Sequence, residues 1–146
     1  MRLTRHTDYA LRILLQAAVE PDQRLSIAAV ASAQAISRNH AMKVVNELAN
    51  GGLLATVRGR GGGFMLARPA ADISIGEVVR LMEPDIRPAD CENCMLGRNC
   101  GLVPILGDAM RAFLDELDRR TLAEAVTRSS LPFPLVLPEA GPVAVT

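Results

Sequence analysis

Three cysteines close together are the side chains in this sequence best suited to chemistry. They form the pattern Cys91-x2-Cys94-x5-Cys100. Thiolates on one loop can converge on a single inorganic centre, and they are the usual ligands of iron–sulfur clusters and of structural zinc. Both centres usually take four ligands, so another group must complete the shell. The candidates elsewhere in the chain are His6, Asp8, His40, Asp90 and Glu92.

Other interpretations of the cysteines remain open at this point. Zinc is the next candidate after iron. A redox pair of Cys91 and Cys94 is a third, although the β-α-β context of thioredoxin-like proteins does not precede it. Three free thiols without a metal are the fourth. Tight clustering in a short loop favours a metal site over free thiols.

A second group of polar side chains has the composition of a DNA-reading surface. A predicted helix opens with Ser37, Arg38, Asn39 and His40, and Lys43 lies one turn further on. Residues at the start of such a helix can bind base edges and phosphates. His40 could also be a core or metal-binding histidine, but its polar neighbours favour exposure. Taken alone, the same face could be an ordinary solvated surface.

A glycine-rich segment follows this helix, between two β-prone runs at 53–57 and 64–67. Its sequence is Arg58-Gly59-Arg60-Gly61-Gly62-Gly63. Glycine lets the backbone approach DNA closely, and arginine is favoured in a narrow minor groove. A P-loop is excluded, because the glycines lie between strands and no lysine follows them. The order of helix, glycine stop and hairpin predicts DNA contacts by Arg58, Arg60, Gly61 and Gly62.

The charge distribution favours a nucleic-acid partner although the formal net charge is zero. Residues 1–68 contain nine Lys/Arg and four Asp/Glu, whereas residues 69–146 contain seven and twelve. Phosphate attraction depends on the local face, so a basic first half is sufficient. Aromatic residues make up only 3% of the chain and Trp is absent. This argues against proteins that stack single-stranded bases on aromatic side chains.

Localisation can be predicted from the start of the chain and from its apolar runs. Charged residues interrupt the helical pattern over residues 1–19, which is unlike a signal peptide. The longest apolar runs are far too short to span a bilayer. We therefore expect a cytoplasmic protein without membrane association, in which thiols stay reduced.

The elements that position these groups follow from periodicity, caps and breakers. The predicted helices are 4–19, 27–33, 38–50, 75–82 and 102–120, and the capping box Thr121-Leu122-Ala123-Glu124 opens a short final one. The fold class is mainly α with a small β-hairpin wing. We predict a winged helix-turn-helix DNA-binding domain over 1–83, a cluster-binding loop over 84–101, a dimerisation helix and short final helix over 102–128, and a flexible proline-rich tail over 129–146.

A long apolar stripe on the helix after the cysteines needs a covering surface. Its members are Leu102, Leu106, Ala109, Met110, Phe113, Leu114 and Leu117. We expect this helix to pair two copies of the chain and so to form a homodimer. The alternative is packing within its own subunit, as amphipathic helices usually do.

Five short motifs outside the cysteine loop have a familiar order. They are Met1-Arg2-Leu3-Thr4, Thr7-Asp8-Tyr9-Ala10-Leu11-Arg12, Ile36-Ser37-Arg38-Asn39-His40, Val57-Arg58-Gly59-Arg60-Gly61-Gly62-Gly63 and Ile75-Gly76-Glu77-Val78-Val79. With the cysteine loop and the helix after it, they resemble a bacterial family of winged-helix iron–sulfur repressors that includes NsrR and IscR. The resemblance covers roughly residues 1–128. It is greater to NsrR, the nitric-oxide sensor, because no histidine follows Cys100.

This resemblance implies a homodimer with one iron–sulfur cluster per subunit, 4Fe–4S rather than 2Fe–2S. The implied ligands are Cys91, Cys94, Cys100 and Asp8 of the partner subunit. The implied function is a nitric-oxide-sensitive repressor that binds palindromic operator DNA and releases it when the cluster reacts. The alternative is a regulator of the same fold that senses iron, cluster supply or thiol oxidation. An enzyme is disfavoured, because no nucleotide motif or partnered general base is visible.

Overall fold

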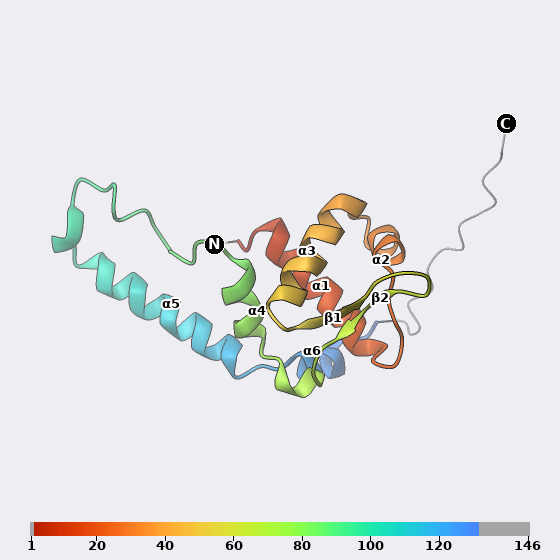
Figure 1. The fold of residues 1–146 in the computed structure, drawn as a ribbon. Coiled ribbons are helices and arrows are strands. Elements are labelled where there is room, and N and C mark those ends of the chain that lie inside the picture. Colours follow the sequence, from red (N-terminus) through yellow and green to blue (C-terminus); the bar gives the residue numbers. More distant parts are fainter. Residues whose placement is uncertain (1, 132–146) are drawn as a thin grey trace.

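Three helices open the chain and form the helical part of an N-terminal head (Figure 1). The computed structural model describes residues 2–131. It contains α1 (Arg5–Val19), α2 (Ile27–Ala33) and α3 (Arg38–Asn50), close to the predicted bounds. Each helix begins where a hydroxyl side chain accepts a hydrogen bond from a first-turn backbone N–H, which the helix itself leaves without a partner. The capping residues are Thr4, Ser26 and Ser37.

A two-stranded antiparallel hairpin follows α3 and is the predicted wing. Strand β1 (Leu54–Val57) pairs with β2 (Gly63–Leu66). The first strand begins one residue later than predicted. The reason is that the Leu53 backbone N–H donates to the Leu48 carbonyl at 2.9 Å and closes the end of α3 instead. A 3-10 turn (η1, Ala70–Asp72) leads on from the hairpin.

The core of the head lies where α1, α3, the hairpin and α4 (Ile75–Met82) meet. Phe64 of β2 is only 1% exposed, so the base of the hairpin is anchored in this core, while its tip extends beyond the core and accepts one hydrogen bond from Arg24 at Gly61. A β-bridge from Phe64 to Leu25 adds a second attachment. The largest fully buried side chains are Phe64, Ile13, Leu14, Leu48, Leu53, Ile73 and Leu122.

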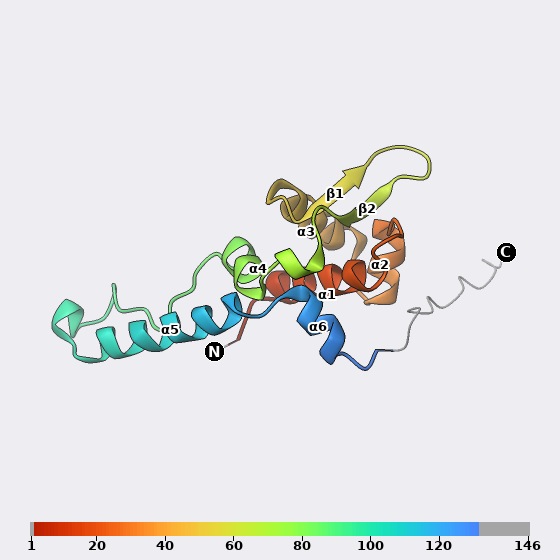
Figure 2. The same ribbon diagram turned by 90° about the horizontal axis from the view of Figure 1, so that it is seen from below.

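The cysteine segment and the next helix form an arm that extends away from the head (Figures 1 and 2). An irregular loop with one 3-10 turn (η2, Gly97–Asn99) follows α4. Helix α5 (Leu102–Asp118) runs back beside this loop and contacts α4 near the head. The short α6 (Leu122–Arg128) then packs against α1. We use the name arm for residues 84–118.

The predicted fold class, mainly α with a β-hairpin wing, is confirmed by this element order. Helix α5 ends at Asp118, two residues before the predicted end. Most of the predicted flexible tail, residues 132–146, lies outside the described residues. In the described part of the chain, every helix is too short or too polar to cross a membrane.

Candidate DNA-reading face and cysteine loop

The outward face of α3 carries the side chains predicted to read DNA. The opposite face is buried in the head through Ala41, Val44, Val45 and Leu48, as predicted. Arg38, Asn39 and Lys43 are exposed on the outward side. Because the buried face fixes the rotation of the helix, two cations and one amide are presented together to solvent.

Ser37 and His40 make contacts within the head. Ser37 Oγ accepts a hydrogen bond from the His40 backbone N–H at 3.2 Å. The half-buried His40 ring stacks on His6, with 5.6 Å between centroids, and meets Tyr9 edge-on at 4.8 Å. The exposure that we expected for His40 is therefore only partial. Helix α1 passes close to the first turn of α3, which the pattern of α3 alone does not reveal. DNA contacts by both residues stay predictions.

His6 connects α1 to two successive levels of α3. Its Nε2 lies 2.7 Å from Glu47 Oε2, and its Nδ1 lies 3.3 Å from His40 Nε2. These contacts hold the first turn of α1 against the recognition helix. The two histidines therefore have structural partners in the head, and neither is directed at the cysteine loop.

The tip of the wing presents two arginines to solvent. Arg58 and Arg60 are both exposed and alternate with glycines. Gly59 and Gly61 adopt φ values of +95° and +71°, a region that side chains disfavour. The Gly62 N–H donates to the Gly59 carbonyl at 3.0 Å and closes the turn. The glycines thus allow a tight, slender tip on which the two guanidinium groups project.

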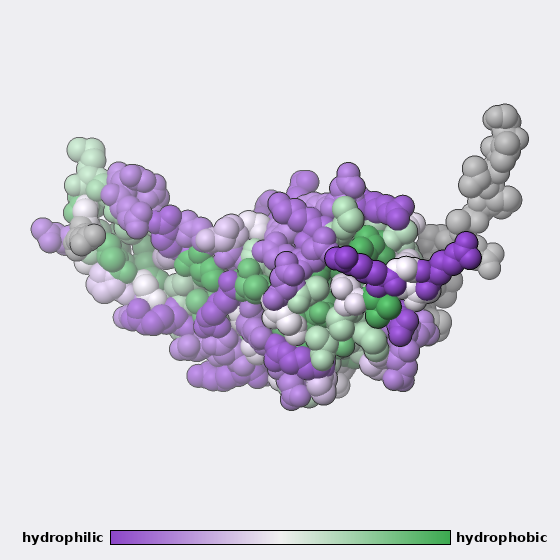
Figure 3. All heavy atoms as spheres, viewed as in Figure 1, coloured by the Kyte–Doolittle hydropathy of each residue, from purple (hydrophilic) through white to green (hydrophobic). Residues whose placement is uncertain are grey.

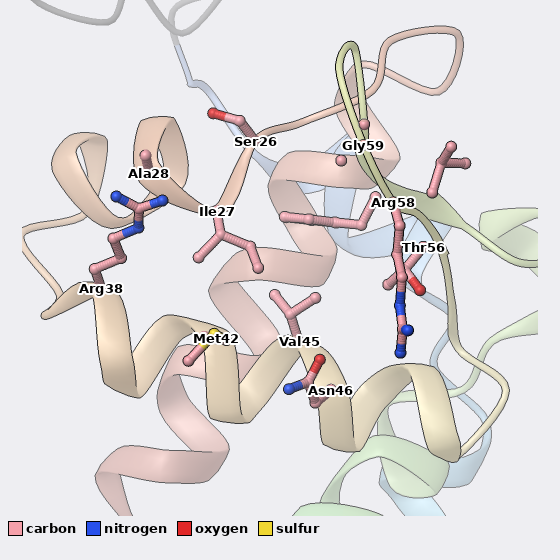
Figure 4. Close-up of a pocket in the computed structure, with 14 residues that line it drawn as sticks. Ser26, Ile27, Ala28, Arg38, Met42, Val45, Asn46, Thr56, Arg58 and Gly59 are labelled. Atoms are coloured by element: carbon pink, nitrogen blue, oxygen red, sulfur yellow. The ribbon is translucent and has the colours of Figure 1, made fainter.

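A cleft of about 350 Å³ separates α3 from the wing (Figure 4). Arg38 lies on its α3 side and Arg58 on its wing side, so cationic groups flank the opening. Apolar side chains also line it, among them Ile27, Met42 and Val57. Figure 3 shows hydrophobic surface at this position, between α2, α3 and the wing.

The three cysteines lie on the arm and form no disulfide. Cys91 and Cys100 are half-exposed, and Cys94 is exposed. Local backbone hydrogen bonds hold the loop, including Gly97 N–H to Cys94 O at 3.0 Å and Cys100 N–H to Gly97 O at 3.3 Å. Three accessible thiols on a loop of this kind can close around one centre. The donor set therefore fits an iron–sulfur cluster in its chemistry.

The fourth-ligand candidates have other partners within the single chain. Asp8 accepts two hydrogen bonds from Arg12, at 3.1 and 2.6 Å. Asp90 and Glu92 bind side chains of their own loop, and the two histidines contact each other in the head. Among residues 2–131, no three His, Cys, Asp or Glu side chains lie close enough to hold a metal ion. A complete shell therefore requires a rearrangement of the loop that brings the three thiols together, and a fourth group in addition to them.

Glu83, which immediately precedes the arm, holds the base of the arm against the first turn of α1. Its Oε2 accepts from the buried Thr7 hydroxyl at 2.5 Å and from the Thr4 N–H at 3.1 Å. Thr4 is itself the cap of α1. Consecutive residues of this turn thus have different partners: His6 contacts α3, Thr7 contacts the base of the arm, and Asp8 contacts Arg12.

The opposite end of the arm is fixed to α4 by one ion pair. Both terminal guanidinium nitrogens of Arg80 bind the Asp118 carboxylate, with Nη2 to Oδ2 at 2.8 Å. The hydrogen bond and charge of Arg80 hold the pKa of Asp118 below its usual range. Gly76 lies directly beside this pair, and a Cβ there would overlap the Asp118 carboxylate. Glycine at position 76 therefore permits the close approach of α5.

These features together define a class of protein. A helical head with an exposed polar recognition helix, followed by an arginine-bearing wing, is a winged helix-turn-helix DNA-binding unit. Residues 3–128 match the model of the family described as "Rrf2: Iron-dependent Transcriptional regulator". The chain belongs to this family and is a transcriptional regulator. The predicted family is thereby confirmed, whereas the closer likeness to NsrR stays a prediction.

Solved structures of similar regulators cover nearly the whole described chain. The oxidised form of Staphylococcus aureus CymR is 28% identical, covers 90% of this chain and 100% of its own, and has a TM-score of 0.73. CymR of B. subtilis, titled the global cysteine regulator, is 23% identical over 88% and 98%, with a TM-score of 0.71. IscR of T. potens is 19% identical over 91% and 95%, with a TM-score of 0.72. The last two show the shared fold alone.

Sequence reasoning missed the contacts that join the arm to the head. Glu83 and Thr7 are 76 positions apart, and neither belongs to a motif that indicates the other. Met42, exposed on the outward side of α3, was not among the residues predicted to read DNA. The signal available for Met42 was an apolar residue among the polar positions of α3.

Proposed function

We propose that this chain is a dimeric repressor that binds palindromic operator DNA and releases it in response to nitric oxide. The observation that carries the proposal is the position of three accessible thiols on the arm, whose base is bonded to the DNA-reading head. A sensor needs a reactive site that is coupled to its output surface. Glu83 joins the base of the arm to the first turn of α1, and His6 of the same turn contacts Glu47 of α3.

The DNA-binding part of the proposal rests on α3 and the wing. The exposed side chains of α3 that enter the major groove are Arg38, Asn39 and Lys43. Arg58 and Arg60 of the wing bind the adjacent minor groove and its phosphates. The first turn of α3 brings backbone N–H groups near phosphates, and Gly61 and Gly62, which lack side chains, let the backbone of the wing approach the DNA closely. Ser37 and His40 contribute at the edge of this surface.

The homodimer part rests on the uncovered side of α5. Leu102 and Ile105 are 58% and 62% exposed, and in the described chain Met110 is the one buried residue of this helix. Figure 3 shows hydrophobic atoms along the arm. Apolar area of this kind on an extended helix is stabilised by burial against a second copy. Pairing of the arms would join two reading heads, as a palindrome requires.

Cys91, Cys94 and Cys100 would hold the cluster, with Asp8 of the partner subunit as fourth ligand. When bound, an iron–sulfur cluster supplies iron that nitric oxide attacks. Within one chain Asp8 is bound by Arg12, so ligation requires that Arg12 yield the carboxylate. A carboxylate is a harder and weaker ligand than a thiolate for such iron, so Asp8 would be the most weakly held of the four ligands. Its return to Arg12 would free the two heads from a fixed spacing.

The proposal is tested on protein purified without oxygen. Iron and sulfide are counted, the absorbance spectrum is recorded, and operator binding is followed during titration with nitric oxide. We expect a coloured protein that loses visible absorbance and operator affinity together. A colourless zinc protein, or an operator affinity that does not change with nitric oxide, would overturn the proposal.

A second candidate function, sensing of thiol oxidation, is favoured by one specific observation. The chain is 28% identical to S. aureus CymR, which was solved in an oxidised form. Cys94 is exposed and therefore open to oxidants. The two functions differ in metal dependence. Metal-free protein that binds operator and releases it on treatment with peroxide, with recovery by dithiothreitol, would favour the second candidate.

A further inference from the structure

Met42 is an apolar side chain on an otherwise polar part of the recognition helix. Its side chain is 46% exposed, because it does not belong to the buried face of α3. That face consists of Ala41, Val44, Val45 and Leu48. Arg38 lies four residues before it and Asn46 four residues after it, so the three side chains form one row along the helix. Both neighbours carry hydrogen-bonding groups of the kind that read base edges.

The surroundings of Met42 have the shape and charge of a DNA contact. Met42 lines the cleft between α3 and the wing, together with Arg38 and Asn46 (Figure 4). None of the fourteen residues that line this cleft carries a carboxylate, and Arg38 and Arg58 flank it. Cationic flanks and the absence of acidic side chains among these residues complement a phosphate backbone. The cleft is also continuous with the surface that is proposed above to bind operator DNA.

We propose that Met42 is a specificity-determining residue that contacts the C5 methyl group of a thymine in each operator half-site. This inference rests on the proposed DNA-binding function. In the major groove the thymine methyl is the apolar group that base pairs present, and apolar side chains read it by contact. A methionine is unbranched and polarisable, so it can follow the methyl group closely. Arg38 and Asn46 would position the row by hydrogen bonds to neighbouring groups.

Exchange of single thymines for deoxyuridine tests this contact, because it removes the methyl group and leaves the base pair otherwise unchanged. Operator duplexes are first selected from a randomised pool with the full-length, anaerobically purified protein. Each thymine of the selected sequence is then replaced in turn. Burial of one methyl group corresponds to about a fourfold change in affinity. We expect one thymine per half-site to show it, and symmetric replacement to weaken binding by roughly fifteenfold.

The variants Met42→Ala, Met42→Leu and Val57→Ala assign the methyl contact to its side chain. Met42→Ala should bind thymine and deoxyuridine duplexes equally, whereas Met42→Leu should keep most of the difference. Val57, 42% exposed on the wing side of the same cleft, is the matched control. Val57→Ala should leave the difference intact, because the wing does not reach the major-groove methyl. If Met42→Ala and wild type show the same loss at every thymine, the inference is overturned. If no duplex is selected from the pool, both the proposed DNA-binding function and this inference are overturned.

Discussion

At the residue scale, the function depends on which partners the charged and hydrogen-bonding side chains have. The cysteines, the arginines of the wing and the outward face of α3 could be identified from the sequence, because motif spacing and periodicity are local properties. The pair of Asp8 and Arg12 is also local, because the two residues are four positions apart on one helix. The partners of His40 and Thr7 could not be identified, because each of them belongs to a segment that is distant in the chain.

Asp8→Ala should separate iron binding from regulation. The three thiolates remain, so we expect iron content near that of the wild type. The tie to the second subunit is lost, so operator affinity should fall by about tenfold, a change that corresponds to roughly 1.4 kcal/mol. Iron analysis and fluorescence anisotropy with operator DNA measure the two effects. Asp90→Ala is the control. Unchanged affinity and unchanged response to nitric oxide would remove Asp8 from the mechanism.

Arg60→Ala should weaken DNA binding without changing the cluster. Arg60 is exposed at the wing tip, so its loss should not affect folding. Each lost phosphate contact lowers the slope of log K against log salt concentration by about 0.9, or about 1.8 for two subunits. Anisotropy titrations at several salt concentrations measure the slope. Arg128→Ala, on α6 away from the wing, should keep the wild-type slope. An equal slope for Arg60→Ala would exclude a phosphate contact at this position.

At the scale of elements, most of the architecture could be predicted and the contacts between elements could not. The starts of four helices match the prediction, because Ser26, Ser37, Ser74 and Thr121 each cap a first turn, whereas α1 begins one residue late because Thr4 is its cap. The bounds of both strands differ from the predicted ones by one residue, and the Leu53 N–H donates to α3 while the Leu53 carbonyl accepts from Ala67 at 3.0 Å. The extension of the arm away from the head could not be predicted from periodicity. The apolar stripe of α5 indicates that a surface covers it, but not which surface.

Gly76→Ala should loosen the joint between α4 and α5. The added methyl group overlaps the Asp118 carboxylate, which must move away from Arg80. Overpacking of this kind lowers the free energy of unfolding by about 1–3 kcal/mol. Thermal and urea unfolding of the metal-free protein measure the change. The control is Gly107→Ala, where the nearest atom to the new methyl is Arg111 Nη1 at 3.7 Å. If both variants are equally stable, the close packing at Gly76 has no energetic role.

At the scale of the whole molecule, the residues predicted to bind DNA lie on the head, and the cysteines and the predicted dimer surface lie on the arm. The head has its own buried core and presents α3 and the wing to solvent. The arm contributes few buried side chains and carries both the thiols and the exposed apolar residues of α5. An exposed residue of the arm can therefore be replaced without disturbing the core of the head, so that a change in DNA binding then reports on assembly.

Ile105→Asp should convert a dimer to monomers. Ile105 is 62% exposed, so an aspartate there leaves the fold of one chain intact but places a charge in the predicted interface. Sedimentation analysis should give about twice the mass of one chain for the wild type and one chain for the variant. Operator affinity should fall by at least about a hundredfold, because the second half-site no longer contributes cooperatively. Asp108→Asn on the same helix is the control. A dimeric Ile105→Asp variant would exclude this side of α5 as the interface.

In the first turn of α1, three successive residues contact three different segments of the protein. His6 supports the recognition helix, Thr7 holds the base of the arm through Glu83, and Asp8 is held by Arg12. Because the three residues share one helical turn, a substitution that shifts the backbone of this turn disturbs all three contacts. In a library of variants sorted for intact regulation, positions 6 and 8 should tolerate fewer replacements than half-buried positions of α2 and α6.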